Sequence, residues 1–347
     1  MRRALCLLFF VACRAHAGQP FTPGDWWNWR DIGTPRINPE GTSVVYVESW
    51  NLRDGDRACA NLWTVATLGG TAGGEPRRLT DGHWRDTSPA WSPDGASIAY
   101  LSDRDGKPQI WVRRLDSAAD RRITRLEEPP LSVAWSPDGK SLAFTARRAE
   151  APPAPAWASA AILPLLRRPA ARVQLFVIPA AGGTVRAYPL GALDGNLSGA
   201  LDIHGEPAWM PDGQSILVSA APPPDAAHAL EGGEIYTVRT TSGERRQITR
   251  HPGPDEAPVA SPDGSRIAWI AREPKAQSYV TSKLYVANAD GSRARVLAGA
   301  LDRDVSHPQW SNDSRTVYFL ADDRGATHVY AARSDGSVRQ EIGRAHV

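Results

Sequence analysis

The chain has 347 residues, of which 41% are hydrophobic and 22% charged, and its formal net charge is +2 at pH 7. Removing Arg2, Arg3 and Arg14, which belong to the leader described next, changes +2 to −1, so the charge indicates neither nucleic acid nor an anionic membrane as a partner. With 29 prolines and 30 glycines, the composition favours a turn-rich all-β protein over a helical one.

The first 17 residues predict a secretory signal peptide, domain 1–17. Two arginines at 2–3 are followed by an apolar run over 4–13 and by a small-x-small cleavage site at 15–17. Because the apolar run is too short to span a bilayer, we expect an exported protein, periplasmic or extracellular, without a membrane span. Residues 11–13 loosely resemble a lipid-attachment box, which makes a lipoprotein the alternative. Only Cys59 remains after cleavage, so no disulfide within the chain is expected.

A tryptophan-rich segment, residues 18–37, follows the leader. We expect it to lead into the first strands and to pack on the outside of the fold. Beyond it, residues 51–61 predict an extended hairpin.

A short turn phrase recurs along the rest of the chain. Its fullest form, Trp-Ser-Pro-Asp-Gly, occurs at 91–95 and again at 135–139. Proline presets the first corner of a type I turn, aspartate hydrogen-bonds its own backbone two residues on, and glycine takes the left-handed conformation that closes the turn. Shorter versions of the phrase occur at 38–41, 210–213, 261–264 and 311–314.

The spacing of the phrase predicts the fold. Measured at the proline, with Asn312 in its place in the last copy, the intervals are 54, 44, 74, 51 and 50 residues. Such a period, with several short strands per unit, is typical of a β-propeller. Each phrase precedes an apolar strand such as 97–101, then an aromatic strand such as 109–112 and a third stretch such as 121–124. We therefore predict an all-β propeller of four-stranded antiparallel blades over residues 18–340, with six blade repeats and the phrase between the first and second strands.

Two further features concern how the blades pack. The 74-residue interval contains a proline-rich insertion, 150–172, whose apolar half predicts a short helix or a clamp on a neighbour, with a surface loop as the alternative. Six of the 13 tryptophans precede the turn phrase or lie in the aromatic strand. At those positions a large ring fills the wedge between blades, so we interpret the tryptophans as interblade packing rather than ligand stacking.

The stretch 89–112 carries a family resemblance. It reads Pro-Ala-Trp-Ser-Pro-Asp-Gly and continues to Leu-Ser-Asp-Arg-Asp-Gly-Lys-Pro-Gln-Ile-Trp-Val. This resembles the propeller repeat of the prolyl oligopeptidase family of serine peptidases, in particular its acylaminoacyl-peptidase and dipeptidyl-peptidase branches, and the resemblance covers nearly all of the mature chain. TolB, the periplasmic propeller of the Tol–Pal system, shares the repeat. TolB-like proteins carry an α/β domain before the propeller, whereas the first blade here begins about twenty residues after the leader, and this favours the peptidase family.

The resemblance implies a C-terminal α/β-hydrolase domain with a Ser-Asp-His triad, which these residues do not contain. No Gly-x-Ser-x-Gly occurs in the sequence, since residues 195–199 fail the spacing. Nor do Glu231 and Glu234, which flank a Gly-Gly turn, resemble the paired-glutamate helix of the dipeptidyl branch. We therefore predict no catalytic residue and no cofactor in this chain, and we expect a peptide substrate only by way of the missing hydrolase domain.

The C-terminal end of the sequence predicts that this chain is a truncated form of a longer protein. Residues 341–347 resemble the translation of a sequencing adapter and are interpreted as a non-native tail, with a genuine short terminus as the alternative. Six blades are also fewer than the seven or eight that the resemblance implies, so we expect the propeller to be incomplete.

Acidic residues near the first strand of five blades are the candidate substrate-binding residues. If these loops open on one face near the central channel, their carboxylates could form a negative funnel for the ammonium end of a peptide. Alternatively, they bond backbone groups across blades. The candidates are Asp86, Glu128, Glu206, Asp255 and Asp304.

No metal site is predicted. The acidic turns at 103–106 and 322–325 lack the third carboxylate and the distal glutamate of a calcium loop.

Together, the repeat, the leader and the family resemblance imply a substrate-gating propeller fragment of an exported serine peptidase. The alternative is a non-enzymatic, TolB-like periplasmic propeller that binds proteins.

Overall fold

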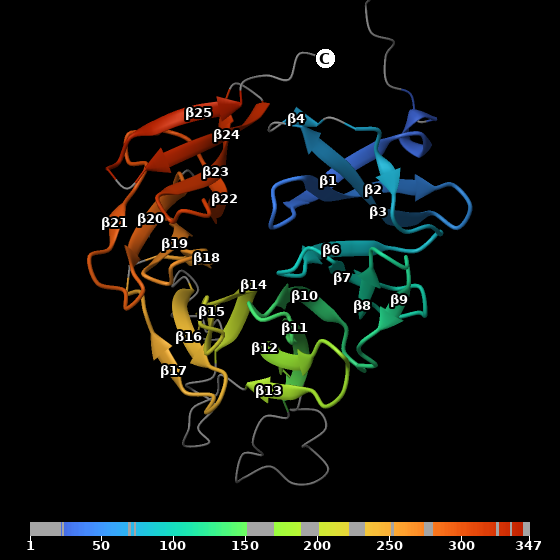
Figure 1. Ribbon diagram of the computed structural model, residues 1–347, viewed down its shortest axis with the longest axis horizontal. Coiled ribbons are helices and arrows are strands. Elements are labelled where there is room, and N and C mark those ends of the chain that lie inside the picture. The colour runs from blue at the N-terminus through green and yellow to red at the C-terminus, as the bar shows by residue number, and fades with distance from the viewer. Residues whose placement is uncertain are drawn as a thin grey trace, which may run out of the picture.

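The computed structural model describes a fold of almost pure β-structure. The described residues are 22, 24–68, 71–72, 74–150, 170–188, 201–221, 233–250, 253–273, 280–323, 326–333 and 335–342. Within them the strands form six antiparallel sheets, in which sequential strands are hydrogen-bonded neighbours. Figure 1 shows these sheets arranged as the blades of a propeller around a common axis, which confirms the predicted fold class.

The first three blades follow the chain in order, after a short 3-10 helix, η1 (Asp25–Trp27). Blade 1 contains β1 (Arg30–Ile37), β2 (Ser43–Leu52), β3 (Arg57–Leu68), β4 (Thr71–Ala72) and β5 (Arg77–Arg78). Blade 2 contains β6 (Asp86–Trp91), β7 (Ser97–Ser102), β8 (Gln109–Arg114) and β9 (Asp120–Arg122). Blade 3 contains β10 (Pro130–Trp135), β11 (Ser141–Glu150), β12 (Ala170–Pro179) and β13 (Arg186–Tyr188).

The second three blades repeat the same order. Blade 4 contains β14 (Asp202–Trp209), β15 (Ser215–Ala221), β16 (Glu234–Arg239) and β17 (Arg245–Gln247). Blade 5 contains β18 (Asp255–Ala260), β19 (Arg266–Ala271), β20 (Lys283–Asn288) and β21 (Arg295–Val296). Blade 6 contains β22 (Val305–Trp310), β23 (Thr316–Asp323), β24 (Ala326–Arg333) and β25 (Val338–Ile342).

Two segments differ from their prediction. The lead-in does not lie wholly outside the ring, because residues 30–37 form β1, which pairs with β2 as the first strand of blade 1. In the insertion, β11 and β12 stay paired as far as Glu150 and Ala170, so residues 170–172 belong to a strand. The predicted helix or clamp falls on 151–169, outside the described residues.

The turn phrase is held by its own side chains. Ser136 Oγ donates to Asp138 Oδ1 at 2.6 Å and accepts from the Ser141 amide at 2.9 Å, while Asp138 Oδ1 also accepts from the Lys140 amide at 3.0 Å. Gly139 closes the turn with φ +69°. The phrase therefore makes a self-contained turn between the first and second strands of each blade, as the sequence predicted.

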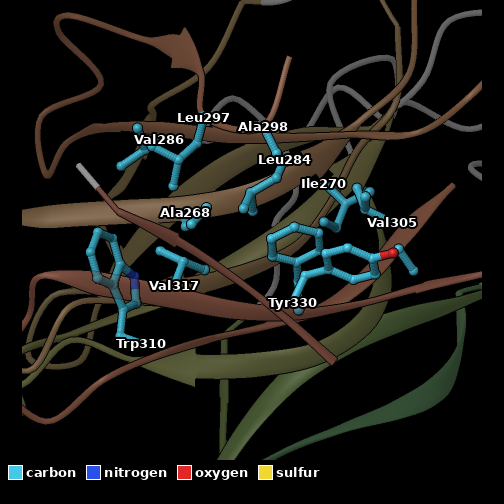
Figure 2. Close-up of a cluster of buried hydrophobic side chains, with 13 residues drawn as sticks. Ala268, Ile270, Leu284, Val286, Leu297, Ala298, Val305, Trp310, Val317 and Tyr330 are labelled. Carbon is cyan, nitrogen blue, oxygen red and sulfur yellow. The ribbon is translucent and has the colours of Figure 1, made fainter. Parts of the chain in front are cut away.

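Five clusters of buried apolar side chains hold the blades together, and each joins two successive blades. Figure 2 shows the cluster between blades 5 and 6, where Val317 and Tyr330 face Ala268 and Leu284. Extensive packing between strands of different blades likewise runs from blades 1 and 2 to blades 5 and 6. Adjacent blades thus share one core per interface.

Tryptophans that end the innermost strands reinforce these interfaces, as the sequence predicted. Each indole Nε1 donates to a main-chain carbonyl on the innermost strand of the preceding blade, at 2.9 to 3.3 Å. The pairs are Trp91 with Arg36, Trp135 with Ala90, Trp209 with Ala134 and Trp310 with Val259. Blade 5 has Ala260 at the corresponding position.

In the described part of the chain, the ring is not sealed between blades 6 and 1. Among the described residues, no apolar cluster joins these two blades, and Figure 1 shows β22–β25 and β1–β4 as the two ends of an arc. In β23 the burial alternates, with Val317 and Phe319 buried toward blade 5 and Tyr318 38% exposed on the other face. In β2, Val45 and Val47 are buried and the residues between and beside them are half-buried, whereas β19, in the middle of the arc, is buried on both faces.

Candidate functional site

The innermost strands β1, β6, β10, β14, β18 and β22 surround the central channel (Figure 1). Each of them has a register shift against its neighbour, which marks a β-bulge. A bulge adds an unpaired residue to a strand and re-aims its side chain. Each bulge contains an exposed or half-buried residue: Thr34, Ser88, Leu131, Glu206, Ala257 and His307.

The backbone at these bulges is unusual. Four of the residues have a left-handed φ of +46° to +53° and directly precede a proline, although neither glycine nor asparagine is present: Thr34, Ser88, Ala257 and His307. Such a conformation costs about 1–3 kcal/mol where the side chain is not glycine. In β14 the left-handed residue is Gly205, with φ +75°, and Glu206 follows it.

An ion pair joins two opposite blades across this channel. Arg36 Nη2, on β1 of blade 1, donates to Glu206 Oε1 at 3.0 Å and to Oε2 at 2.9 Å, on β14 of blade 4. The side chains are 35% and 56% exposed, so the pair is in contact with solvent. Among the five acids that the sequence predicted, Glu206 thus pairs with a cation of a blade that is not its neighbour.

Asp86 and Asp255 occupy matching positions, as the first residues of β6 and β18, and both are fully buried. Asp86 accepts from Trp84 Nε1 at 3.1 Å and from Arg104 Nη2 at 3.4 Å, and burial raises the pKa of its carboxyl group. Burial also raises the pKa of Asp255, to about 6. The hydrogen bonds that Asp86 accepts from Trp84 and Arg104 come from side chains of its own blade rather than from backbone groups across blades, so these two acids decide neither the funnel nor its structural alternative.

The other two predicted acids are exposed. Asp304, just before β22, accepts from the amide and the hydroxyl of Ser282 at 2.8 and 3.0 Å. Glu128 lies two residues before β10, on the surface. The five acids are thus distributed one per blade over blades 2 to 6, in three different environments, and a role in substrate binding stays a prediction.

Sequence reasoning missed Arg36, although a signal was present. Aligning the innermost strands on the residue that precedes the turn phrase places Arg36 opposite only uncharged residues in the other blades: Ala90, Ala134, Ala208, Val259 and Gln309. A single charged side chain among five uncharged equivalents departs from the repeat, and such a departure is where a functional residue is expected.

Arg104, a residue of the acidic turn at 103–106, lies among aromatic rings and acids from outside the turn. The Arg104 guanidinium lies 4.4 Å from the centre of the Trp111 ring and 5.3 Å from that of Trp84. It donates to the Tyr100 hydroxyl at 2.6 Å and to Asp120 at 3.2 Å. Burial raises the pKa of the Tyr100 hydroxyl, so it stays protonated. These hydrogen bonds, ion pairs and cation–π contacts join the start of blade 2 to the turn at 103–106 between its second and third strands.

Two hollows lie away from the channel. One, of about 600 Å³, is bordered by turn phrases of blades 3 and 4, including Asp138 and Asp212. The other, of about 760 Å³, lies between blades 1 and 2 and is lined by Trp84 and Arg104 among others. Because turn phrases and the loops between blades lie at opposite ends of the strands, the hollows open on opposite faces of the disc.

Comparison with known proteins places the chain among propellers. Residues 30–156 match the family described as the TolB beta propeller domain. Over 350 residues the chain is 28% identical to dipeptidyl-peptidase 5 of Porphyromonas gingivalis, which covers 94% of this chain and 50% of that protein. It is 26% identical over 338 residues to YuxL of Bacillus subtilis, an uncharacterized peptidase. This alignment covers 88% of this chain and 49% of that protein.

A solved structure shows the same fold. Pyrococcus horikoshii acylaminoacyl peptidase matches with a TM-score of 0.64 and 19% identity, over 92% of this chain and 47% of that one. The chain therefore spans about half the length of the curated relatives it matches. Within the described part of the chain, no helix has the length and apolar character needed to cross a membrane.

Proposed function

The chain contains a TolB-type β-propeller and is homologous to dipeptidyl-peptidase 5 and YuxL, and from this premise we propose that it is the substrate-gating propeller of an exported serine peptidase. The observation that carries the proposal is the extent of the sequence similarity: 94% of the chain aligns with a dipeptidyl-peptidase.

In this proposal the propeller limits access and a separate domain performs the chemistry. Oligopeptides would pass the channel, whereas folded proteins would be excluded by its width. Peptide hydrolysis would proceed by acyl transfer through a serine in an α/β-hydrolase domain that lies outside these residues. The purified 347-residue chain should accordingly hydrolyse no peptide.

The proposed domain organisation is a signal peptide at 1–17, the propeller at 18–340 and a non-native tail at 341–347. The uncovered faces of blades 1 and 6 support an incomplete ring, because a blade in mid-ring is buried on both sides. We propose that at least one further blade, outside these residues, packs between them in the complete protein.

Reading the genomic locus past codon 347 tests the proposal. We expect an open frame that encodes the rest of the ring and then a domain with Gly-x-Ser-x-Gly. The complete product should react with a fluorophosphonate probe at that serine, and serine-to-alanine substitution should abolish labelling. A native stop codon after Val347, or a downstream sequence with no hydrolase domain, would overturn the proposal in favour of a TolB-like protein-binding propeller.

A further inference from the structure

Among the described residues, blade 1 packs against a neighbouring blade on one face only. Its apolar cluster joins it to blade 2, through Val45, Leu62 and their contacts with Ile98 and Tyr100. On the other side, no apolar cluster of the described residues joins it to blade 6. A repeat at the end of an array has one interface where inner repeats have two, so it is the repeat most free to move.

The Arg36–Glu206 pair supplies blade 1 with a second attachment. The two residues are 170 positions apart in sequence, and they belong to blades separated by blades 2 and 3. The main-chain carbonyl of Arg36 meanwhile accepts from Trp91 Nε1 at 2.9 Å, which fixes its backbone against blade 2. Its backbone is therefore tied to one neighbour while its side chain reaches across the channel.

Glu206 is positioned for this contact by its strand. The register between β14 and β15 shifts between His204 and Ala208, and Gly205 adopts φ +75° within the shift. Pro207 and Ala208 then return the strand to the sheet, which leaves Glu206 exposed on the channel side. A bulge that presents a carboxylate to an arginine of another blade is a specific arrangement, since no other bulge residue of the ring is acidic.

We propose that Arg36 and Glu206 form a salt-sensitive latch that ties blade 1 to blade 4 across the channel. A cationic group that enters the channel, such as the ammonium of a short peptide, releases the latch by replacing Arg36 at Glu206. An ion pair exposed to this degree is weak and is screened by salt, which suits a contact that must open and close. The release by peptides rests on the proposed function, whereas the latch itself does not.

Hydrogen exchange on the full chain tests the latch without requiring catalysis. In Arg36→Gln and in Glu206→Gln, the amides of β1 should exchange about two- to fivefold faster, the range expected for loss of an exposed ion pair. Amides of β19 should be unchanged. The exchanged pair, Arg36→Glu with Glu206→Arg, should restore the slow rate, and 1 M NaCl should speed β1 exchange in the wild type.

A matched control breaks an ion pair that does not cross the channel. Arg303 lies 3.0 Å from Asp323 within blade 6, and Arg303→Gln should leave β1 exchange at the wild-type rate. If β1 exchange is the same in wild type and both single variants, or if the exchanged pair fails to restore it, the latch is wrong. The salt comparison is decisive only beside the variants, because the Arg30–Glu48 pair, at 3.6 Å, also joins β1 to β2 and is screened by salt. In Arg36→Gln, 1 M NaCl should therefore speed β1 exchange less than it does in the wild type.

Peptide release has its own measurement. At constant ionic strength, trialanine with a free ammonium should speed β1 exchange in the wild type and have no effect in Glu206→Gln. Its N-acetylated form should have no effect on either protein. Equal effects of the two peptides, or no effect of either, would refute release by an ammonium group, while a missing hydrolase domain at the locus would refute only the proposed function.

Discussion

Asp255 should make the stability of this propeller depend on pH in an unusual direction. Its side chain is fully buried at the start of β18, and burial raises its pKa from 3.8 to about 6. The folded chain therefore holds this proton more tightly than the unfolded chain does. Linkage then requires that the contribution of Asp255 to the free energy of unfolding be largest below about pH 4 and be lost as the pH rises through about 6.

The magnitude follows from the shift. A rise of about 2.2 pKa units corresponds to about 3 kcal/mol between the acidic and the neutral limit, at about 1.36 kcal/mol per unit. In Asp255→Asn the side chain is neutral at every pH, so this penalty is removed. Relative to the wild type, the variant should gain about 2 kcal/mol of unfolding free energy on going from pH 4 to pH 7, because the unfolded carboxyl is already partly ionised at pH 4.

Urea unfolding followed by circular dichroism, at half-unit steps from pH 4 to pH 7.5, measures this difference. A matched control is Ser219→Ala, which removes the hydrogen bond from the Ser219 hydroxyl to the main-chain oxygen of Asp255 without changing a charge. The control should shift the unfolding free energy by the same amount at every pH. A difference between Asp255→Asn and wild type that stays constant within about 1 kcal/mol would refute the argument.

Two further variants probe the blade interfaces. Trp135→Phe keeps most of the ring but loses the 3.0 Å bond from Nε1 to the Ala90 carbonyl, so urea unfolding should show a loss of about 1–2 kcal/mol, with the exposed Trp29→Phe as control. Gly291→Ala should cost more than about 2 kcal/mol in the same assay, because φ is +85° and a Cβ would collide with the Ile248 carbonyl oxygen. Gly213→Ala, with φ +67° but open space around the Cβ, should cost less, and equal losses would contradict a role for the collision.

The blade architecture was predictable because its determinants are local. Proline, aspartate and glycine form the turn within a few residues of one another, and the repeat interval then gives the number of blades. The serine of the phrase was overlooked, although Ser136 bonds both Asp138 and the Ser141 amide. Its role is also local and can be recognised in other copies.

The channel contact was not predictable in the same way. Arg36 and Glu206 come together only because the arc curves through blades 2 and 3, and the sequence around either residue does not indicate which residue it will contact. The buried acids show a second limit. Asp86 and Asp255 were expected in channel loops, but as first strand residues they turn toward a blade interface, because a shift of one position moves a strand side chain to the other face.

The tryptophan bonds have a direction that bears on biosynthesis. In all four of those described, the indole belongs to the later blade and the accepting carbonyl to the earlier one. A blade leaving the ribosome thus finds its acceptor already in place on the blade made before it, and N-terminal units fold first during synthesis. The blades can therefore be added to the ring one after another in the order of translation. Blade 5, which has Ala260 in place of the tryptophan, lacks this bond to the preceding blade.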